Sequence, residues 1–481
     1  MRYFFCFLTY LVIGILIGQD TALSGRISDQ HTEMPLVGAT IQLVGPDQQY
    51  GTVTDSNGYY RFTTVTPGRY DMLVTYIGYL PIKIPGQLLG SGPVTARNIA
   101  LEVDSNLDLP NIIVRSTPLK INPLTRQVTL DEVRRLPATF YDPARLLALT
   151  PGVAQVNDQA NHLSVRGNSP DRNLWRLQGL AIVNPNHTAN AGTRSDFPGF
   201  AGGGVNALSA QLLDNSTFYP GGLPVENGFA TGGTFAMRLR PGNNLKRQHQ
   251  AQAGFIGFDF ATEGPIGKGG EKKASYLVNY RYSFTGLLAD LGVDFGGEEI
   301  RFQDLSLHVY QPLKNGGELS LFGIYGLSNN DFTGAGELEA EEEKDLLNIN
   351  YENQLGIVGL NFSSPIFAGI GKMHVGGAYS TTEQDYAREL LRFPDFIDPM
   401  LFFVASHARL NVKAGLDLLL GATTTLSIGV EQLTEWAGYD YSRTRLANDV
   451  RLTSTASYLS FEQKAGPWQF DFGTRLVRYQ A

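Results

Sequence analysis

The second half of the chain alternates apolar and polar residues with a period of two. In the segment SYLVNYRYSF (275–284), aromatic or aliphatic side chains take every second position, and Asn279 and Arg281 lie between them. The same alternation recurs in residues 304–309, 409–416, 425–430 and 468–473. A period of two is typical of β-strands with one apolar and one polar face, so this half is predicted to be a series of strands.

The connections between these predicted strands alternate in length. Short turns are expected at residues 267–273, 312–317, 366–371, 421–424 and 464–467. Long loops are expected at residues 285–301, 328–354, 382–407 and 433–455. Outer-membrane barrels have short turns at the periplasmic end and long loops at the outer end. Nothing in a soluble sandwich requires such an alternation of loop lengths. The pattern therefore predicts that the aromatic face of 275–284 meets lipid and that Asn279 and Arg281 face a water-filled lumen.

Residues 1–22 have the pattern of a secretory signal peptide, because Arg2 precedes an apolar run from Tyr3 to Gly18. This run is shorter than the ~20 apolar residues that a membrane-spanning helix needs. The single cysteine of the chain, Cys6, lies inside this segment. The exported chain is therefore expected to have no disulfide and no thiol chemistry.

Residues 23–103 contain short alternating runs separated by turn signals, a pattern typical of a small β-sandwich. The order PLVGATIQL, TVTDSNGYYRF, PGRYDMLVTYIGY resembles the carboxypeptidase-regulatory-like domain. That resemblance implies a transthyretin-like sandwich without peptidase chemistry. Asp55, Asn57 and Gly58 suggest a calcium loop at first sight, but the later Glu of such loops is missing, so a plain turn is predicted.

A linker at 104–114 leads to a glycine-rich region, 115–245. The segments LTPGV, SVRG and GGTFAMRLRPG occur there in the order seen in the plug domain of TonB-dependent outer-membrane receptors, which this region resembles. A helix is predicted at 142–149, and Trp175 is expected in the plug core. Two positions depart from the family pattern: Gln178-Gly179 replaces the usual Asp-Gly, and Pro110 lies inside the segment that corresponds to the TonB box.

The resemblance also constrains the strands of 246–481. Because a plug enters from the periplasm, the first strand runs outward, and the first short turn must follow an even number of strands. Residues 249–267 are therefore predicted to form two strands with a tight connection near Gly257, and residues 248–479 to contain eleven strands in total. Eleven antiparallel strands cannot close, and plugged lumens belong to barrels of about 22 strands. The chain is therefore expected to be the N-terminal part of a larger receptor, with the first half of a transmembrane β-barrel.

Composition and charge exclude other classes of protein. The chain of 481 residues has 54 glycines and 17% charged residues, which favours strands and turns over helices and thus an all-β-dominated fold. The resemblance implies that this fold includes an α+β plug. A net charge of −8 argues against a protein that binds nucleic acid. The seven histidines are scattered, and no hydrolase, metalloprotease or P-loop spacing occurs. We therefore expect no catalytic residues, no enzyme activity, no cofactor and no metal site, and we interpret Gly202–Gly204 as a flexible loop.

The resemblance implies active import of a scarce, large solute across the outer membrane of a Gram-negative bacterium, with the N-terminal domain in the periplasm. The expected partners are the TonB energy-transducing complex, outer-membrane lipid and a solute that is a siderophore, vitamin, peptide or glycan. TonB contact is expected from strand addition at Asn111, Ile112, Ile113 and Val114. Solute contact is expected at Asn184, Asn186, His187 and Arg194.

Two other hypotheses remain at this stage. A cell-surface adhesion or structural protein built of β-domains explains the sandwich and the missing catalytic residues, but it does not explain the alternating loop lengths. A sensor whose plug signals rather than transports is expected to have a different N-terminal domain.

Overall fold

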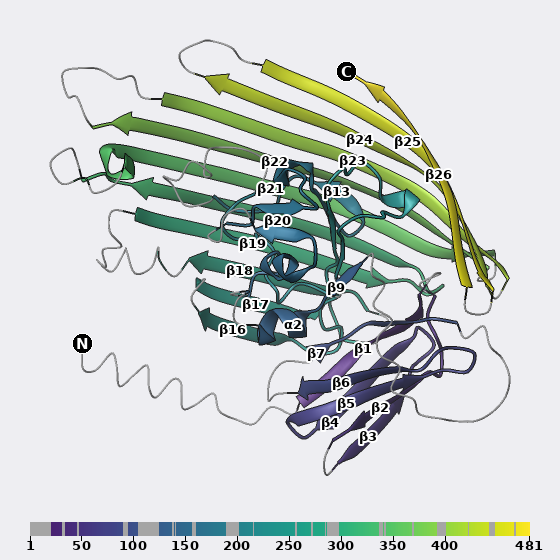
Figure 1. Ribbon diagram of the computed structural model, residues 1–481. Coiled ribbons are helices and arrows are strands. Elements are labelled where there is room, and N and C mark those ends of the chain that lie inside the picture. The colour runs from purple at the N-terminus through teal and green to yellow at the C-terminus, as the bar shows by residue number, and fades with distance from the viewer. Residues whose placement is uncertain are drawn as a thin grey trace, which may run out of the picture. The chain divides into compact units, whose positions relative to one another are not determined.

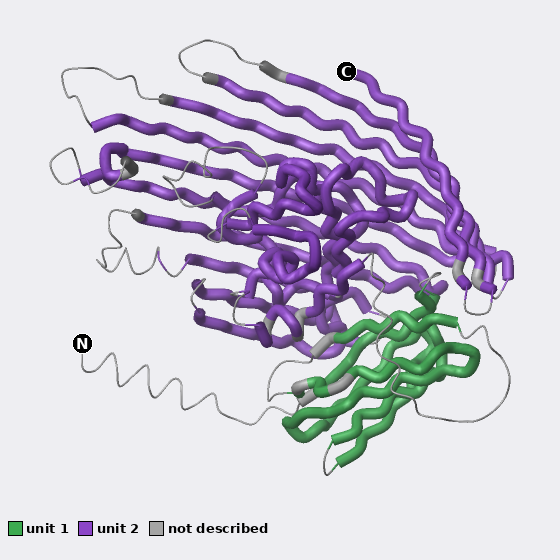
Figure 2. The backbone as a smooth tube through the Cα atoms, in the orientation of Figure 1, with its two compact units in different colours: residues 1–104, 109–117 green, residues 105–108, 118–481 purple. Residues whose placement is uncertain are grey.

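The structure of the protein is a computed structural model (Figure 1). It describes residues 21–481 except 31–33, 46–47, 90–94, 104–124, 137–138, 140, 156–159, 189–201, 215, 255–256, 271–272, 284, 286–297, 336–339, 341–342, 368–369, 392–400, 422, 442–447 and 466–467. The chain divides into two compact units, which are coloured separately in Figure 2. Most of the predicted signal segment and all of the predicted TonB-contact residues lie outside the described residues.

The first unit contains one mixed and one antiparallel sheet around one apolar core. One sheet is formed by β1 (Thr21–Asp29), β4 (Tyr59–Val65), β7 (Thr95–Ala96) and β8 (Ile99–Leu101). The other is formed by β2 (Thr40–Val44), β3 (Gln49–Val53), β5 (Gly68–Thr75) and β6 (Ile82–Leu89). The predicted sandwich is thus confirmed, and its alternating residues, such as Ile41, Leu43 and Met72, are completely buried.

The turn at Asp55 is held by local hydrogen bonds. Its Oδ1 accepts from the N–H groups of Asn57 and Tyr59, both at 2.8 Å. Gly58 has a φ of +76°, a conformation that glycine adopts without strain. These bonds are those of an ordinary Asx turn, as the sequence predicted.

The second unit begins with residues 125–245, which we call the plug. They contain a small mixed sheet. The sheet order is β13-β12-β15-β14-β9. Its strands are β9 (Arg126–Val128), β12 (Leu174–Leu177), β13 (Leu180–Ile182), β14 (Ser216–Tyr219) and β15 (Thr234–Met237). A separate hairpin pairs β10 (Val153–Gln155) with β11 (Leu163–Val165). The helices are α2 (Leu130–Arg135) and the 3₁₀ helices η2 (Arg145–Leu149), η3 (Pro170–Arg172) and η5 (Val225–Asn227).

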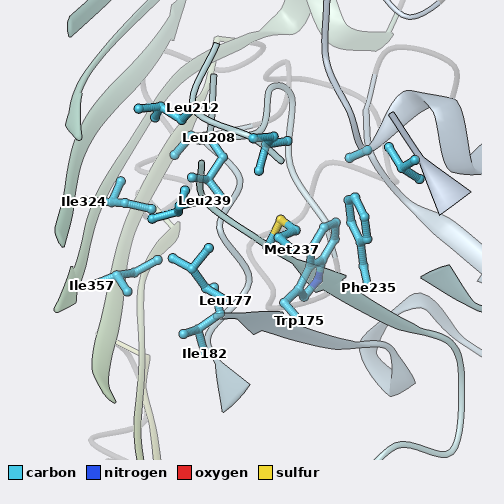
Figure 3. Close-up of a cluster of buried hydrophobic side chains, with 14 of the residues drawn as sticks. Trp175, Leu177, Ile182, Leu208, Leu212, Phe235, Met237, Leu239, Ile324 and Ile357 are labelled. Atoms are coloured by element: carbon cyan, nitrogen blue, oxygen red, sulfur yellow. The ribbon is translucent and has the colours of Figure 1, made fainter. Parts of the chain in front are cut away.

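Two local predictions in the plug were wrong. The helix expected at 142–149 is a five-residue 3₁₀ helix, Arg145–Leu149, because Asp142 folds back to accept hydrogen bonds from the N–H groups of Ala144 and Asn206. The loop at Gly202–Gly204 is tightly packed: a Cβ on Gly203 would lie 2.2 Å from the carbonyl oxygen of His187. Trp175 is in the plug core, as expected, and Figure 3 shows it beside Phe235 and Met237.

The rest of the second unit is one eleven-stranded antiparallel sheet, which we call the wall. Consecutive strands pair in the order β16 to β26. They are β16 (Gln248–Gly254), β17 (Gly257–Pro265), β18 (Ser275–Ser283), β19 (Glu298–Pro312), β20 (Glu318–Phe332), β21 (Leu347–Ile366), β22 (Gly371–Leu390), β23 (Leu401–Gly421), β24 (Thr424–Tyr441), β25 (Asn448–Ala465) and β26 (Trp468–Gln480), with the 3₁₀ helix η6 (Glu343–Leu346) before β21. The predicted count of eleven strands and the division of 249–267 into two strands are both confirmed.

Each wall strand has an inward face, toward the plug, and an outward face. In β18 burial alternates strictly, and Tyr280 is 42% exposed whereas Asn279 is completely buried. The predicted assignment of faces is therefore correct. At Arg281 the expectation of a water-filled lumen was wrong. This side chain is 5% exposed and donates to the carbonyl of Asn206 in the plug.

Candidate functional site: the interface between plug and wall

Apolar contact joins the plug to the wall at the centre of the interface. Leu177, Ile182 and Leu239 of the plug belong to the same buried cluster as Ile324 and Ile357 of the wall. Figure 3 shows the two wall side chains pointing at the plug residues. This contact has no directionality, so the polar bonds around it must define how the plug is placed.

The outer edge of plug strand β13 is covered by side chains of the wall. The N–H of Ala181 donates to Asn411 Oδ1, and the N–H of Val183 donates to Ser380 Oγ, both at 2.9 Å. A sheet edge otherwise presents a row of unpaired backbone groups. Here two wall side chains complete the hydrogen bonding of that edge.

The carbonyl groups of the same edge are paired in the same way. Asn361 Nδ2 donates to the carbonyl of Gln178, and Arg409 Nη1 donates to that of Ile182, both at 2.7 Å. Further along, the N–H of Thr188 donates to Ser328 Oγ at 3.0 Å. Four consecutive wall strands, β20 to β23, therefore bind the backbone of one plug segment, which we call the edge segment (178–188).

The turn between β12 and β13 explains one departure from the family pattern. Gln178 and Gly179 have φ values of +53° and +82°, the conformations of a two-residue hairpin turn of the primed type. The Gln178 side chain is fixed because its Oε1 accepts from the N–H of Leu239 and its Nε2 donates to Ser320 Oγ. Glutamine at this position therefore adds a contact between plug and wall.

A buried ionic cluster connects β12 to the far strands of the wall. Arg176 Nη1 donates to Glu431 Oε1 at 2.9 Å, and both side chains are completely buried. Arg475 Nη2 donates to the other oxygen of Glu431, also at 2.9 Å. Lys413 Nζ donates to the carbonyl of Glu226 in the plug at 3.0 Å. Two arginines thus share one carboxylate, and both also bond to plug carbonyls.

A second buried cluster involves one of the predicted solute residues. His187 Nε2 lies 3.0 Å from Asp304 Oδ2, and Arg281 Nη2 donates to the same oxygen at 2.7 Å. The His187 ring is stacked on Phe302 with 5.0 Å between ring centroids. Gly326 makes room for it, because a Cβ there would lie 2.9 Å from His187 Cε1. His187 thus fixes the plug to β19 and β20.

A third cluster fixes the C-terminal end of the plug, shortly before the first wall strand. Arg240 donates to both carboxylate oxygens of Glu263 at 2.8 and 3.0 Å, and its Nε donates to the carbonyl of Gln211 at 2.7 Å. His308 Nδ1 lies 2.8 Å from the carbonyl oxygen of Arg240. These bonds therefore hold the backbone at Arg240 against β17 and β19.

A small cavity of about 30 Å³ lies between the plug and β16 to β19, near the connection from β16 to β17. Its lining includes Tyr141, Gln211, Asp259 and Arg281. Tyr141 has a φ of +62°, a strained value for a residue other than glycine. The space is large enough for about two water molecules, so a large solute cannot be held there as the structure stands.

The predicted solute residues are buried rather than presented on a surface. Asn184, Asn186 and His187 are 7%, 3% and 2% exposed, and Arg194 lies outside the described residues. Asn184 Nδ2 donates to the carbonyl of Gly202 at 2.7 Å, and Asn161 Nδ2 donates to Asn186 Oδ1 at 3.1 Å. The structure therefore brings three of the four together, but in contact with plug and wall.

The sequence analysis missed the residues that build the interface. Arg176, Glu431, Arg475, Arg240 and Glu263 were not singled out. A usable signal was present, because charged residues at polar positions of membrane-crossing strands face inward. What the pattern could not show is that their partners are plug residues far away in the sequence.

The described residues contain neither a metal-binding group of side chains nor a helix that could cross a membrane. Within them, no group of His, Cys, Asp and Glu residues is arranged to hold a metal ion. None of their helices has the length and apolar character needed to cross a membrane.

Comparison with known proteins gives matches to parts of the chain. Residues 22–102 match the carboxypeptidase regulatory-like domain, as the sequence resemblance implied. Over 136 residues the chain is 27% identical to YddB of Escherichia coli strain K12, a protein described as uncharacterized. This match covers 26% of the chain and 17% of YddB.

Solved structures resemble most of the chain. The outer membrane transporter YddB from Escherichia coli superposes with a TM-score of 0.51 at 12% identity, covering 74% of this chain and 56% of that one. A mutant of the ferric enterobactin receptor PfeA from Pseudomonas aeruginosa gives a TM-score of 0.54 at 15% identity, covering 74% and 57%. The copper transporter OprC gives 0.52 at 14% identity, covering 74% and 55%.

The chain thus spans little more than half the length of these solved proteins and about a sixth of the curated relative. At such low identities the likeness concerns the fold. The plug and the eleven-stranded wall have the fold of outer-membrane receptors and transporters, which is the fold that the resemblance to TonB-dependent receptors predicted.

Proposed function

We propose that this protein is a TonB-dependent receptor of the outer membrane that imports a scarce, large solute when its plug is moved. The observation that carries the proposal is a plug held by polar hydrogen bonds against a wall whose outward face has a belt of apolar side chains. Cross-strand pairs such as Leu321 with Leu360, Val358 with Tyr379 and Val412 with Gly377 continue this apolar face from strand to strand.

The outward face is suited to lipid from β17 to β26. Its exposed large side chains form an apolar belt: Phe258, Phe260, Tyr280, Leu305, Leu307, Leu319, Leu321, Tyr325, Val358, Leu360, Val375, Tyr379, Leu410, Val412, Ile428, Val430, Leu459, Phe461, Phe470 and Phe472. A soluble protein rarely exposes so large a continuous apolar surface. This belt weighs against the adhesion hypothesis, which gives it no use.

The interface suits a plug that must be held and then released. The edge segment is attached to the wall by hydrogen bonds between its backbone and polar side chains, and water can replace each of them. Transient water entry would therefore lower the cost of moving the plug. Proteins with this fold include a ferric enterobactin receptor and a copper transporter, so the present chain is proposed to serve transport as well.

Solute contact at Asn184, Asn186, His187 and Arg194 remains part of the proposal. The first three are engaged with Gly202, Asn161 and Asp304. Contact with a solute would therefore break bonds that hold the edge segment. Binding outside would in this way be coupled to loosening of the plug, because each state is stabilised by different contacts.

The TonB contact gives the sharpest test. Because Cys6 lies in the predicted signal peptide, a mature chain with Ile113→Cys has a single thiol. We expect this variant to form a disulfide with a cysteine-containing TonB in cells. Ile77→Cys is the matched control, since Ile77 is 91% exposed in the N-terminal domain. Failure of Ile113→Cys to exceed the control, or recovery of the protein outside the outer membrane, would refute the proposal.

A further inference from the structure

Cationic side chains gather at one corner of the wall, where the connection from β17 to β18 lies next to the start of β16. Lys246, Arg247, Lys268 and Lys273 are all exposed there. None of them forms an ion pair with a described residue. The strand register places this corner on the rim of the short turns, opposite the connection between β16 and β17.

The corner is held together by backbone contacts. The N–H of Gly270 donates to the carbonyl of Asn244 at 2.9 Å, and that of Ile266 donates to the carbonyl of Ala274 at 2.8 Å. A Cβ on Gly269 would lie 2.3 Å from the carbonyl oxygen of Leu245. The turn therefore lies directly on the segment before β16, which keeps Lys268 close to Lys246.

A glycine on the outward face completes the site. Gly264 pairs with Tyr276 on the neighbouring strand. A Cβ on Gly264 would lie 2.7 Å from Arg247 Cγ and 3.2 Å from the Tyr276 hydroxyl. The arginine stem and the tyrosine hydroxyl thus meet over this glycine, and Arg247 is an exposed residue.

An apolar surface begins directly beside these polar groups. Phe260 and Tyr280 form a cross-strand pair on the outward face and are 46% and 42% exposed. Cations with long stems extend from such a surface to the polar boundary of a membrane, and aromatic side chains gather at the same level. The corner thus has the chemistry of a membrane interface with an excess of positive charge.

We propose that Arg247, Lys268, Lys273 and Tyr276 bind the phosphodiester headgroup of an anionic phospholipid, whose acyl chains lie along Phe260 and Tyr280. This inference rests on the proposed function, which places the short-turn rim in the periplasmic leaflet. A guanidinium and two ammonium groups match a phosphate oxygen cluster, and the tyrosine hydroxyl supplies a neutral donor. Zwitterionic lipid gains less, because its headgroup has no net charge.

The test uses the full chain inserted into phosphatidylcholine vesicles that contain a minor share of phosphatidylglycerol. After extraction in mild detergent, mass spectrometry of the intact protein counts the lipids retained. We expect phosphatidylglycerol to be enriched on the unchanged chain. Each lost cation should weaken the preference about fivefold, so Arg247→Gln/Lys268→Gln/Lys273→Gln should remove most of it.

Two further variants separate the site from general charge. Arg451→Gln removes an exposed cation of β25, which lies over the Trp436 ring, and should leave the enrichment unchanged. Tyr276→Phe removes one hydroxyl without altering charge, and it should weaken retention less than the triple variant. All these residues are exposed or half-buried, so the substitutions should leave the fold intact. Protease protection in the vesicles checks folding independently.

Several results would overturn the inference. It is wrong if the unchanged chain shows no preference, if the triple variant keeps it, or if Arg451→Gln loses as much. It is also wrong if inorganic phosphate displaces the lipid at matched ionic strength, since the site would then recognise phosphate itself. Recovery of the protein outside the outer membrane of the producing cells would instead refute the proposed function.

Discussion

Glu431 is a completely buried carboxylate that accepts hydrogen bonds from one arginine of the plug and one of the wall. Burial of a charge is costly unless partners compensate it, and here the partners are Arg176, Arg475 and the amide of Asn411. The three groups come from β12, β26 and β23. The stability of the interface therefore depends on each of them being present.

We predict that Glu431→Ala destabilises the second unit by about 3–5 kcal/mol, because two buried guanidinium groups lose their carboxylate. The measurement is urea unfolding of the full chain in detergent, followed by Trp175 fluorescence with Trp436 and Trp468 replaced by Phe. Asp171→Ala is the control, since the exposed Asp171–Arg172 pair should contribute about 0–1 kcal/mol. Equal losses for both variants would contradict the argument.

Asp71 gives a pH-dependent contribution to the first unit. The N–H of Gly86 and then the ammonium of Lys83, at 2.9 Å, hold the pKa of the Asp71 carboxyl below its usual value. A carboxyl with a lowered pKa stabilises the folded state above its unfolded pKa. That contribution is lost as the pH falls through the lowered folded pKa.

We therefore predict that protection of β6 against hydrogen exchange, corrected for the intrinsic rate, decreases as the pH falls below about 4, the usual pKa of aspartate. Asp71→Asn should have a flatter dependence, because it has no proton to bind in this range. Mass spectrometry of the peptide 82–89 gives the measurement. The same slope in both chains would mean that another group controls the loss.

At the scale of elements, β13 is an edge strand that the wall completes with side chains. Edge strands usually need protection against pairing with other chains. In this plug the protection comes from Asn361, Ser380, Arg409 and Asn411, which project from three neighbouring wall strands. Such bonds determine the register of the plug on the wall without another strand.

We predict that Ser380→Ala/Asn411→Ala increases hydrogen exchange within the edge segment, because two buried N–H groups lose their acceptors. An unpaired buried group costs about 1–3 kcal/mol, so exchange at Ala181 and Val183 should rise at least about fivefold. Gln354→Ala is the matched control: it removes a hydrogen bond to the Tyr325 hydroxyl on the outward face. If the control has the same effect, the bonds to β13 are not what holds the segment.

Element prediction succeeded where the alternation of short and long connections decided the outcome. The turn near Gly257 follows from strand parity, and Gly257 there has a φ of +146°. The predicted helix 142–149 failed because Asp142 is used by Asn161 and Asn206, which lie far along the chain. Helix α2 was missed; its N-cap is Thr129, whose side chain accepts from the N–H of Glu132.

At the scale of the whole molecule, the apolar belt lies toward one end of the strands. On β21 the outward residues change from Asn350, Glu352 and Gln354 to Val358 and Leu360. Under the proposed function, this change marks where the lipid-facing part of the strand ends. The polar remainder of the strand continues toward the long loops.

We predict that Val358→Arg reduces insertion of the full chain into lipid vesicles, because a cation in the lipid-facing belt costs about 2–4 kcal/mol at the bilayer midplane. Glu352→Arg, six residues away on the same face, should insert normally although its charge changes more. Protection of the wall from added protease measures insertion. Normal insertion of Val358→Arg would place the membrane elsewhere on the wall.

The sequence alone determined the strands of the wall, their faces, the sandwich and the burial of Trp175, since each depends on residues close together in the chain. Tertiary structure decided the rest. Asn184, Asn186 and His187 are polar loop residues by pattern, yet they are buried in contacts with the rest of the plug and with the wall. Glu431 and Arg176 are 255 positions apart, and their pairing depends on the plug lying against β24. Local periodicity indicates which face of a strand is polar; what that face meets depends on how the chain returns to it.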